Sequence, residues 1–254
     1  MTNLLRYLKI AIILHLLVAG RAMANDIVAS RHVSSADGLS SNIVHAIAQD
    51  KDGYMWFGTV NGLCRYDGYS FVTYRSLSPD PQKHIVASIA SIIADNKHGL
   101  IWVTTPRNQV ACFDTNTAQF ADYTGRNDYE KQYRKLLLAD NGLWMYSTRI
   151  GARFVEYSNG VFTATDYTQA DSVLPSNYVV EIIIDRNKNT WIATDKGITM
   201  IMPDKTVRQI KSNVKIAECN TDGRNMLFLT STGSTLTYDL NGRLLRETPD
   251  SPLG

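Results

Sequence analysis

The stretch from Asp37 to Tyr74 constrains the fold more than any other part of the chain, and its sequence is DGLSSNIVHAIAQDKDGYMWFGTVNGLCRYDGYSFVTY. Short apolar runs alternate with three turn sequences, and each turn contains a glycine that follows Asp or Asn. Such pairs between apolar runs are the strongest local signal for a tight β-hairpin. The stretch therefore predicts a meander of four antiparallel strands, with Gly53, Gly62 and Gly68 at its turns.

The same pattern recurs four more times, at about 81–123, 133–167, 171–210 and 213–248, with weaker similarity. An aromatic residue in the second predicted strand marks every copy. A repeat of roughly 40 to 50 residues that contains four strands is typical of a β-propeller blade. The sequence therefore predicts an all-β chain, a propeller of about five four-stranded antiparallel blades. The marker residues are Trp56, Trp102, Trp144, Trp191 and, in place of a tryptophan in the fifth copy, Phe228.

These aromatic residues have two interpretations. A single blade cannot bury both of its faces, so blades must stack and share side chains. An aromatic residue at one repeated position would then be a wedge between neighbouring blades, and the alternative is a platform on which sugars stack. Recurrence at a single repeat position favours packing. Truncation of one tryptophan to alanine is then expected to cost about 3 to 5 kcal/mol of stability.

The N-terminal residues have the features of a secretory signal peptide. Arg6 and Lys9 precede an apolar run, and Ala22, Met23 and Ala24 form the small-x-small pattern of a cleavage site. The run is shorter than the about 20 residues that a membrane span needs. We therefore expect export and cleavage after Ala24, with an uncleaved membrane anchor as the alternative.

The charge pattern argues against nucleic acid as a partner. The chain has 26 Lys and Arg against 24 Asp and Glu, and its predicted signal segment holds three basic residues and no acidic one. The remainder is close to neutral, with its basic residues scattered through predicted turns and strand ends. A nucleic-acid-binding domain would instead gather them on one surface.

The repeats divide the chain into segments. Residues 25–36 have the pattern of a fourth strand without the rest of its blade, and propellers often close by letting such a strand complete the final blade. The fifth copy has its own fourth strand at 243–248, so we expect an incomplete, truncated propeller; the alternative is a compact ring of five blades with a redundant strand. The expected segments are a signal peptide (1–24), a lone strand (25–36), blades at 37–80, 81–132, 133–170, 171–212 and 213–248, and a tail (249–254).

The three cysteines are an odd number for an exported chain. Cys64 and Cys112 occupy similar places in the third strands of the first two copies, and Cys219 lies in the fifth. We expect buried free thiols. The alternative is a Cys64–Cys112 bridge, which needs neighbouring blades to bring the two Cα atoms to about 4.4 to 6.8 Å.

The first copy resembles the two-component-regulator propeller repeat, which is found in the periplasmic sensor regions of hybrid two-component systems of Bacteroides-type bacteria. The resemblance implies a Gram-negative periplasmic location, a role in signal transduction and an oligosaccharide ligand. Full-length members continue into a membrane helix, a histidine kinase, a receiver and a DNA-binding domain. The residues that carry the resemblance are Leu39, Ser41, Asn42, Asp50, Gly53, Trp56, Gly58, Thr59, Gly62, Leu63, Arg65, Tyr66, Asp67 and Gly68.

The chain departs from that layout after Thr248, where no second apolar span and no kinase follow. Kinase activity is therefore not expected of these residues. The expected partners are an oligosaccharide, which the resemblance implies, and a second copy or further propeller blades, which would complete a truncated propeller. Membrane contact is expected only through an uncleaved signal segment or a C-terminal part beyond this sequence.

Enzyme and cofactor motifs do not occur in the sequence. It contains no G-x-S-x-G, no P-loop, no H-E-x-x-H and no Gly-rich dinucleotide motif. Its five histidines lack metal-ligand spacing. We expect no catalytic residue, no metal and no cofactor. Two alternatives stay open: a catalytic propeller such as a polysaccharide lyase or glycosidase, whose carboxylates would meet only in space, and a protein-binding scaffold.

The turns between the second and third strands are the expected place of recognition, because loops on a rigid scaffold usually carry binding residues. The second and third copies depart from the regular turn of the first and place Arg107, Asn108 and Arg149 there. An arginine can donate to sugar hydroxyls or carboxylates in a fork geometry. We therefore predict Arg107, Asn108 and Arg149 as ligand contacts; the alternative is that they are solvated turn residues.

Overall fold

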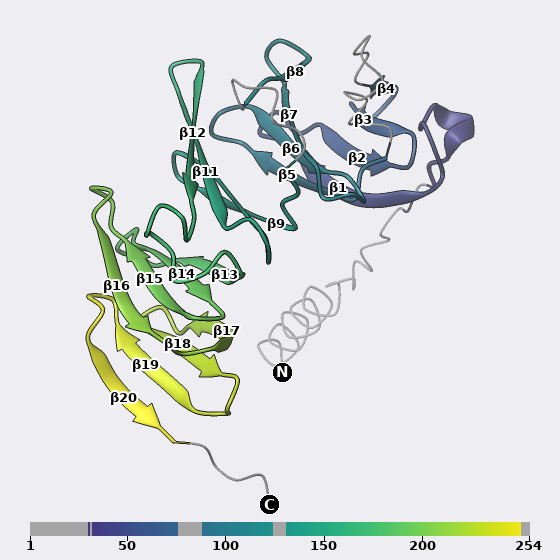
Figure 1. The fold of residues 1–254 in the computed structure, drawn as a ribbon. Coiled ribbons are helices and arrows are strands. Elements are labelled where there is room, and N and C mark those ends of the chain that lie inside the picture. The colour runs from purple at the N-terminus through teal and green to yellow at the C-terminus, as the bar shows by residue number, and fades with distance from the viewer. Residues whose placement is uncertain (1–29, 31, 76–87, 124–130, 250–254) are drawn as a thin grey trace, which may run out of the picture. The chain divides into compact units, whose positions relative to one another are not determined.

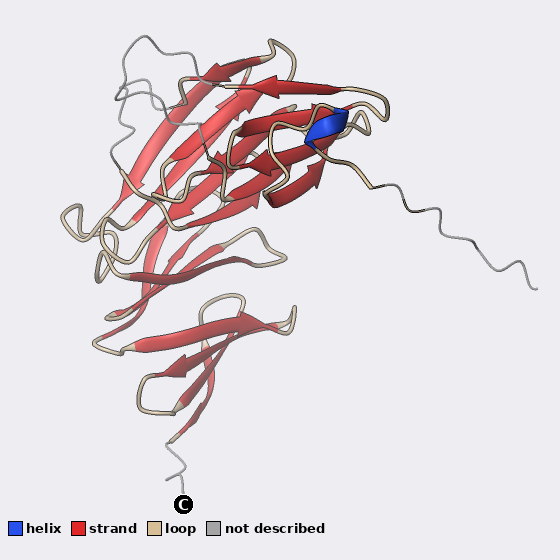
Figure 2. Cartoon of the chain, turned by 90° about the vertical axis from the view of Figure 1, so that its right-hand side faces the viewer, coloured by secondary structure: helices blue, strands red, loops and turns tan. Residues whose placement is uncertain are grey.

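The computed structural model describes residues 30, 32–75, 88–123 and 131–249. In this part of the chain, strands β1 to β20 form five four-stranded antiparallel sheets, and each sheet is a meander in chain order (Figure 1). Figure 2 shows strands and loops with one short helical turn. This confirms the predicted all-β propeller architecture. No helix in the described ranges is long and apolar enough to cross a bilayer.

The five sheets follow one another along the chain. The first consists of β1 (Val44–Gln49), β2 (Met55–Thr59), β3 (Gly62–Tyr66) and β4 (Phe71–Tyr74), and the second of β5 (Ser91–Asp95), β6 (Leu100–Thr104), β7 (Val110–Asp114) and β8 (Gln119–Ala121). The third consists of β9 (Lys135–Ala139), β10 (Gly142–Tyr146), β11 (Ala152–Ser158) and β12 (Val161–Tyr167). The fourth consists of β13 (Val179–Ile184), β14 (Thr190–Thr194), β15 (Gly197–Ile201) and β16 (Val207–Ser212), and the fifth of β17 (Ile216–Thr221), β18 (Asn225–Thr230), β19 (Thr235–Asp239) and β20 (Leu244–Thr248).

The predicted lone strand at 25–36 differs from the structure wherever the structure describes it. Its described residues lie outside any strand, and Ser35–Asp37 form a 3-10 turn. Ser34 Oγ accepts a hydrogen bond from the Ala36 N–H, and the Asp37 carboxylate accepts one from the Ser34 N–H at 2.9 Å. This capping box favours a helical turn over an extended strand. The rest of the predicted strand, the predicted signal peptide (1–24) and residues 250–254 of the predicted tail lie outside the described residues.

The glycines singled out in the first copy lie at the turns of the first sheet. Gly53, Gly62 and Gly68 have φ angles of 87°, 121° and 97°, in the left-handed region that residues with a Cβ rarely adopt. At Gly62 space is also limited, because a Cβ would lie 3.0 Å from the Tyr74 carbonyl oxygen. These turns determine where β1 to β4 begin and end.

Consecutive sheets pack face to face, and a tryptophan fills each of the four seams between them. Trp56 lies between the first and second sheets and contacts Phe113, with ring centroids 5.3 Å apart. Trp102, Trp144 and Trp191 occupy the next three seams in order. Each tryptophan is at most 4% exposed and faces the sheet that follows it in the chain.

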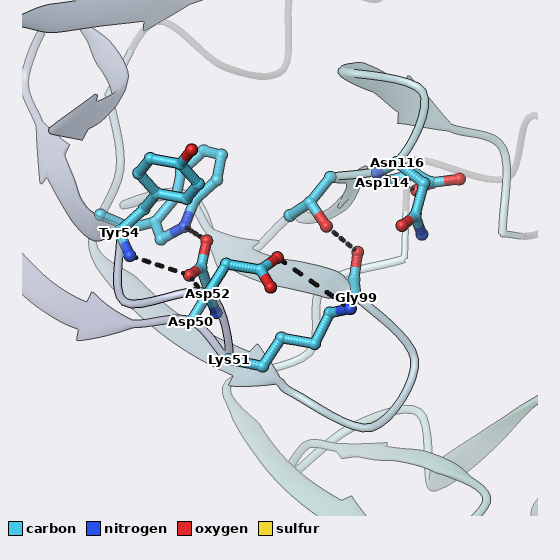
Figure 3. A network of polar contacts seen from close by, with 9 residues as sticks. Asp50, Lys51, Asp52, Tyr54, Gly99, Asp114 and Asn116 are labelled. Carbon is cyan, nitrogen blue, oxygen red and sulfur yellow. Dashed lines mark hydrogen bonds and ion pairs between the residues drawn. The ribbon is translucent and has the colours of Figure 1, made fainter. Parts of the chain in front are cut away.

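An aspartate in the turn after the first strand anchors the tryptophan of the first sheet. Asp50 stands two residues after Ala48, the residue paired with Trp56, and its Oδ2 accepts a hydrogen bond from Trp56 Nε1 at 2.7 Å. Its Oδ1 accepts from the backbone N–H groups of Asp52 and Tyr54, at 3.0 Å each (Figure 3). One carboxylate therefore closes the turn and orients the indole ring.

The fourth sheet repeats this anchor and the second sheet changes it. Asp185 Oδ2 accepts from Trp191 Nε1 at 2.8 Å. In the second sheet, Asp95 Oδ2 instead pairs with Nδ1 of His98 at 2.7 Å, and Trp102 Nε1 is buried without a hydrogen-bond partner in the described part of the chain. The aspartate at this position thus accepts a hydrogen bond from the indole in the fourth sheet and pairs with a histidine in the second.

Phe228 packs in the opposite direction from the four tryptophans. It contacts Trp191 with ring centroids 6.0 Å apart, so it faces the preceding sheet. In the first sheet, the turn aspartate stands two residues after the residue that pairs with the tryptophan. In the fifth sheet, Asp222 stands two residues after Asn220, and Asn220 pairs with Leu227. Leu227 therefore occupies the position that the tryptophan has in the other sheets. Strand side chains alternate between faces, so an assignment one residue out of register places a side chain on the wrong face. Phe228 is a buried packing residue, but it does not replace the tryptophan.

The three cysteines are free thiols. Cys112 lies in the second seam, where burial raises the pKa of its thiol. Cys64 pairs with Phe57 on the face of the first sheet that points away from the second sheet, and its Sγ lies 2.9 Å from Ser40 Oγ. The alternative of a Cys64–Cys112 bridge is therefore wrong, because the two side chains face different neighbours.

An ion cluster joins β11 to β12. The Asp166 carboxylate accepts from Arg153 Nε at 2.6 Å, from Arg153 Nη2 at 3.0 Å and from Lys131 Nζ at 2.9 Å. Arg153 is only 5% exposed, so its charge depends on this partner. The hydrogen bonds from Arg153 are the main reason that the pKa of Asp166 falls from 3.8 to about 2.

The two kinds of indole environment give a first prediction. Trp191→Phe leaves the Asp185 carboxylate without its indole donor, whereas Trp102→Phe removes an N–H that has no partner. We expect Trp191→Phe to lose about 1 to 3 kcal/mol more stability than Trp102→Phe, because the two variants lose similar volume and differ in one hydrogen bond. Urea unfolding followed by circular dichroism measures the difference. Equal losses would contradict the anchoring role of the carboxylate.

The pKa of Asp166 gives a second prediction. A carboxyl group whose folded pKa is depressed stabilises the fold above its unfolded pKa, and that stability is lost as the pH falls from 3.8 to about 2. Because the Asp166 side chain is 35% exposed, solvent screening limits the contribution to about 1 to 2 kcal/mol. Asp166→Asn should therefore lower the free energy of unfolding near neutral pH and flatten its decline in acid. Urea unfolding across this pH range checks it, and an unchanged slope in the variant would count against the assignment.

Candidate ligand-binding site

Each sheet bears its turns at two opposite edges. One edge carries the turns between the second and third strands, at 60–61, 105–109, 147–151, 195–196 and 231–234. The links between sheets also reach this edge; for example, the Val179 N–H donates to the Ser147 carbonyl at 3.1 Å. We therefore name it the connection edge. The other edge, with the turns between first and second and between third and fourth strands, is the hairpin edge. The predicted contacts Arg107, Asn108 and Arg149 all lie at the connection edge.

A cavity of about 280 Å³ opens at the connection edge between the third and fourth sheets. We name it the connection-edge cavity. It is formed by the start of β9, the end of β10 with the turn that follows, and the start of β13. Its lining residues are Arg134, Lys135, Tyr146, Ser147, Thr148, Tyr178, Val179 and Val180.

Glu181 of β13 organises the polar side of this region. Its carboxylate accepts hydrogen bonds from the Tyr146 hydroxyl and from Lys135 Nζ. Lys135 Nζ also donates to the Val180 carbonyl at 3.3 Å. Burial, and then the Glu181 carboxylate, raise the pKa of Tyr146, so its hydroxyl remains a donor. These side chains come from β9, β10 and β13 and tie the third sheet to the fourth.

The lining of the cavity includes none of the three predicted contact residues. Arg149 is exposed on the turn whose Ser147 and Thr148 line the cavity. Arg107 is exposed on the corresponding turn of the second sheet. Asn108 has a φ of 60°, and its backbone carbonyl accepts the Tyr133 N–H at 2.8 Å, so its backbone serves the link between the second and third sheets.

The sequence did not predict a role in the site for Arg134, Lys135, Tyr146 and Glu181. The hydrogen bonds to Glu181 join residues 35 and 46 positions apart, from three strands in two sheets. One local signal was present, because Arg134 and Lys135 are adjacent basic residues at the start of a predicted strand.

The cavity combines cations, hydroxyl groups and aromatic rings. Arg134 and Lys135 supply positive charge, Ser147 and Thr148 supply hydroxyls, and the Tyr178 side chain is 46% exposed. A few polar groups beside aromatic surface are typical of small-molecule sites. Within the described ranges, no three His, Cys, Asp or Glu side chains come close enough to hold a metal ion. The arrangement can hold a polar ligand by hydrogen bonding and by ring contact.

Comparison with known proteins identifies the repeat of the first sheet. Residues 38–61 match the family model described as two component regulator propeller. A region of 44 residues is 48% identical to histidine kinase P4 of Formosa agariphila, and it covers 17% of this chain and 3% of that protein. These findings confirm the resemblance of the first copy to the two-component-regulator propeller repeat.

Two solved structures share the fold at low sequence identity. The extracellular domain of BT4673 from B. thetaiotaomicron, described as a hybrid two component system, is 19% identical with a TM-score of 0.50, over 80% of this chain and 27% of that chain. PorZ of Porphyromonas gingivalis, a surface component of the type-IX secretion system, is 15% identical with a TM-score of 0.50, over 82% and 34%. The chain therefore spans about a third or less of these relatives, and the likeness is one of fold.

Cys219 of β17 offers a test of the environment around Glu181. Burial, and then the Glu181 carboxylate, raise the pKa of the Cys219 thiol to about 12. Only the thiolate is alkylated, and near pH 8 a group with that pKa is roughly one part in ten thousand thiolate. We expect iodoacetamide to modify Cys219 at least about 100-fold more slowly in the folded chain than in urea. Mass spectrometry of the peptide over time measures both rates, and similar rates would contradict this placement of Cys219.

Proposed function

We propose that this chain is the ligand-sensing propeller of a two-component signalling receptor, exported to the periplasm, and that its ligand is an oligosaccharide. The observation that carries the proposal is the match of residues 38–61 to the two component regulator propeller. The relative that shares 48% identity over 44 residues is named a histidine kinase, which supports a role in signalling. The N-terminal pattern of Arg6, Lys9 and Ala22 to Ala24 supports export.

The chemistry of the connection edge supports a sugar ligand. A sugar ring presents hydroxyl groups around its rim and C–H groups on its faces, so it needs hydrogen-bond donors together with aromatic surface. Tyr178 offers an exposed ring beside Ser147 and Thr148. Arg149 lies on the same turn as Thr148, and Arg107 lies on the corresponding turn of the preceding sheet. We infer that an oligosaccharide would lie along the connection edge, where these arginines could serve as further contacts beyond the cavity.

The same geometry favours binding over catalysis. Glycosidases commonly use a pair of carboxylates, one of them free to donate a proton. At the connection-edge cavity, the Glu181 carboxylate already accepts hydrogen bonds from Lys135 and Tyr146. Held in this way, Glu181 positions Lys135 and Tyr146. Signal output would then come from a kinase in the longer receptor.

Alanine substitution at the connection edge tests the proposal. The chain is screened on an array of plant and host oligosaccharides, and the strongest binder is titrated by calorimetry against Arg107→Ala, Asn108→Ala and Arg149→Ala. We expect each arginine variant to bind about tenfold or more weakly, because an arginine–ligand hydrogen bond is charge-assisted. Asn108→Ala should have a smaller effect, since a neutral amide is lost.

The matched control is Arg224→Ala, an exposed arginine between β17 and β18 at the hairpin edge. It should bind as the parent does, and thermal unfolding should show that all variants are folded. Unchanged affinity in both arginine variants would exclude them as contacts. Failure of the parent to bind any oligosaccharide on the array would argue against the ligand class.

A further inference from the structure

The third sheet has no aspartate at the position that anchors the tryptophan in the first and fourth sheets. In the first, second and fourth sheets, an aspartate stands two residues after the residue paired with the tryptophan, and these are Asp50, Asp95 and Asp185. In the third sheet, Leu137 pairs with Trp144, and Ala139 stands at that position. Ala139 lies in the strand ladder because a tight turn of two residues, 140–141, joins β9 to β10. In the first and fourth sheets this turn has five residues, 50–54 and 185–189.

The indole nitrogen of Trp144 is therefore a donor without an acceptor among the described residues. In the described ranges, the fully buried polar side-chain atoms without a hydrogen-bond partner are Trp102 Nε1 and Asp195 Oδ1. Trp144 Nε1 is not one of them, so this unpaired nitrogen keeps some contact with solvent. Trp102 shows the sealed case, and Trp56 and Trp191 show the paired case. Trp144 alone combines a missing carboxylate with access to solvent.

A second cavity, of about 370 Å³, lies where Trp144 reaches the hairpin edge between the third and fourth sheets. We name it the hairpin-edge cavity. Its apolar wall includes Phe154, Tyr167 and Ile201, with the edge of Trp144. Tyr167 and Phe154 pack on Trp144 with ring centroids 5.0 and 4.9 Å away, so the three rings form one aromatic wall. The cavity is large enough for a compact molecule with one ring.

The charges at the rim leave one cation available to a ligand. Asp140 pairs with Lys188 at 2.7 Å, and the Asp185 carboxylate is already bonded to Trp191 and to the backbone of its own turn. Lys205 is 73% exposed and pairs with Glu156 at 3.3 Å, a weak surface contact that a ligand can replace. The donors open to a ligand are thus the Trp144 indole, which has no acceptor among the described residues, and the Lys205 ammonium, which would exchange Glu156 for the ligand.

We propose that the hairpin-edge cavity binds a small carboxylate with a compact apolar body, and that its carboxylate accepts hydrogen bonds from Trp144 Nε1 and Lys205 Nζ. The ligand carboxylate would take the place that Asp50 and Asp185 fill in their own sheets, where the indole donates at 2.7 and 2.8 Å. The apolar body would lie against Phe154, Tyr167 and Ile201. This site lies at the opposite edge from the proposed sugar site and does not depend on it.

Indole signals in a ¹H–¹⁵N spectrum test the proposal, because the chain has four tryptophans. The probe is sodium benzoate, and benzamide is its neutral match. We expect benzoate to shift the Trp144 signal in a saturable way and to leave Trp56, Trp102 and Trp191 in place. Benzamide should bind at least about tenfold more weakly, because it lacks the charge that strengthens the hydrogen bond. Trp144→Phe identifies the signal by removing it.

Ala139→Asp supplies the competing carboxylate from within the chain. The Trp144 signal of this variant should move without ligand, in the direction in which benzoate moves it, and benzoate should then have no further effect. Lys205→Gln should weaken benzoate binding severalfold. Without ligand, the Trp144 signal of this variant should have the same position as in the parent chain.

Three results would overturn the proposal. The first is no movement of the Trp144 signal up to about 10 mM benzoate, a range that covers weak fragment binding. The second is an equal response to benzamide, which would show an apolar pocket without preference for a carboxylate. The third is a folded Ala139→Asp variant that still responds to benzoate. The sugar titrations at the connection edge are independent of all three.

Discussion

Each tryptophan side chain fills the space between two sheets, and the rest of the structure depends on this contact. A four-stranded sheet on its own exposes both faces to water, and burial of apolar surface is the main favourable term in folding. Trp56, Trp102, Trp144 and Trp191 each supply a large apolar surface to the following sheet. In the first and fourth sheets, the aspartate of the hairpin turn also sets the direction of the ring, through the bonds from Trp56 Nε1 to Asp50 and from Trp191 Nε1 to Asp185.

The fold could be predicted because its signals are local. Glycines such as Gly53 and Gly62 mark turns, and their positive φ angles show why other residues are rare there. The register of the fifth sheet was harder to predict. Phe228 is adjacent to the residue at the tryptophan position, and a shift of one residue moves a side chain to the other face of the sheet. Counting from the turn aspartate, here Asp222, would have placed Leu227 in register. The 3-10 turn at Ser35–Asp37 was missed because a short capping box overrides an extended pattern.

The proposed binding regions could be predicted from the sequence only as an edge of the sheets. The loops that carry Arg107 and Arg149 were singled out because they depart from a regular turn, and that departure is visible in the sequence. Lys135, Tyr146 and Glu181 belong to strands of two sheets, and their meeting depends on how the third sheet packs on the fourth. The hairpin-edge cavity is equally hidden, since its lining comes from two sheets and includes Ala139 at a position where other sheets carry an aspartate.

The short turn between β9 and β10 has a wider consequence for how such chains diverge. The third seam opens at both edges, while Trp102 in the seam before it is sealed and Trp191 in the seam after it keeps its aspartate. In a repeat array each unit contacts only its neighbours, so a change in one hairpin alters the packing mainly at one seam. A shortened hairpin or the exchange of a single aspartate can therefore reshape the cavity at one seam, while the scaffold on either side stays intact.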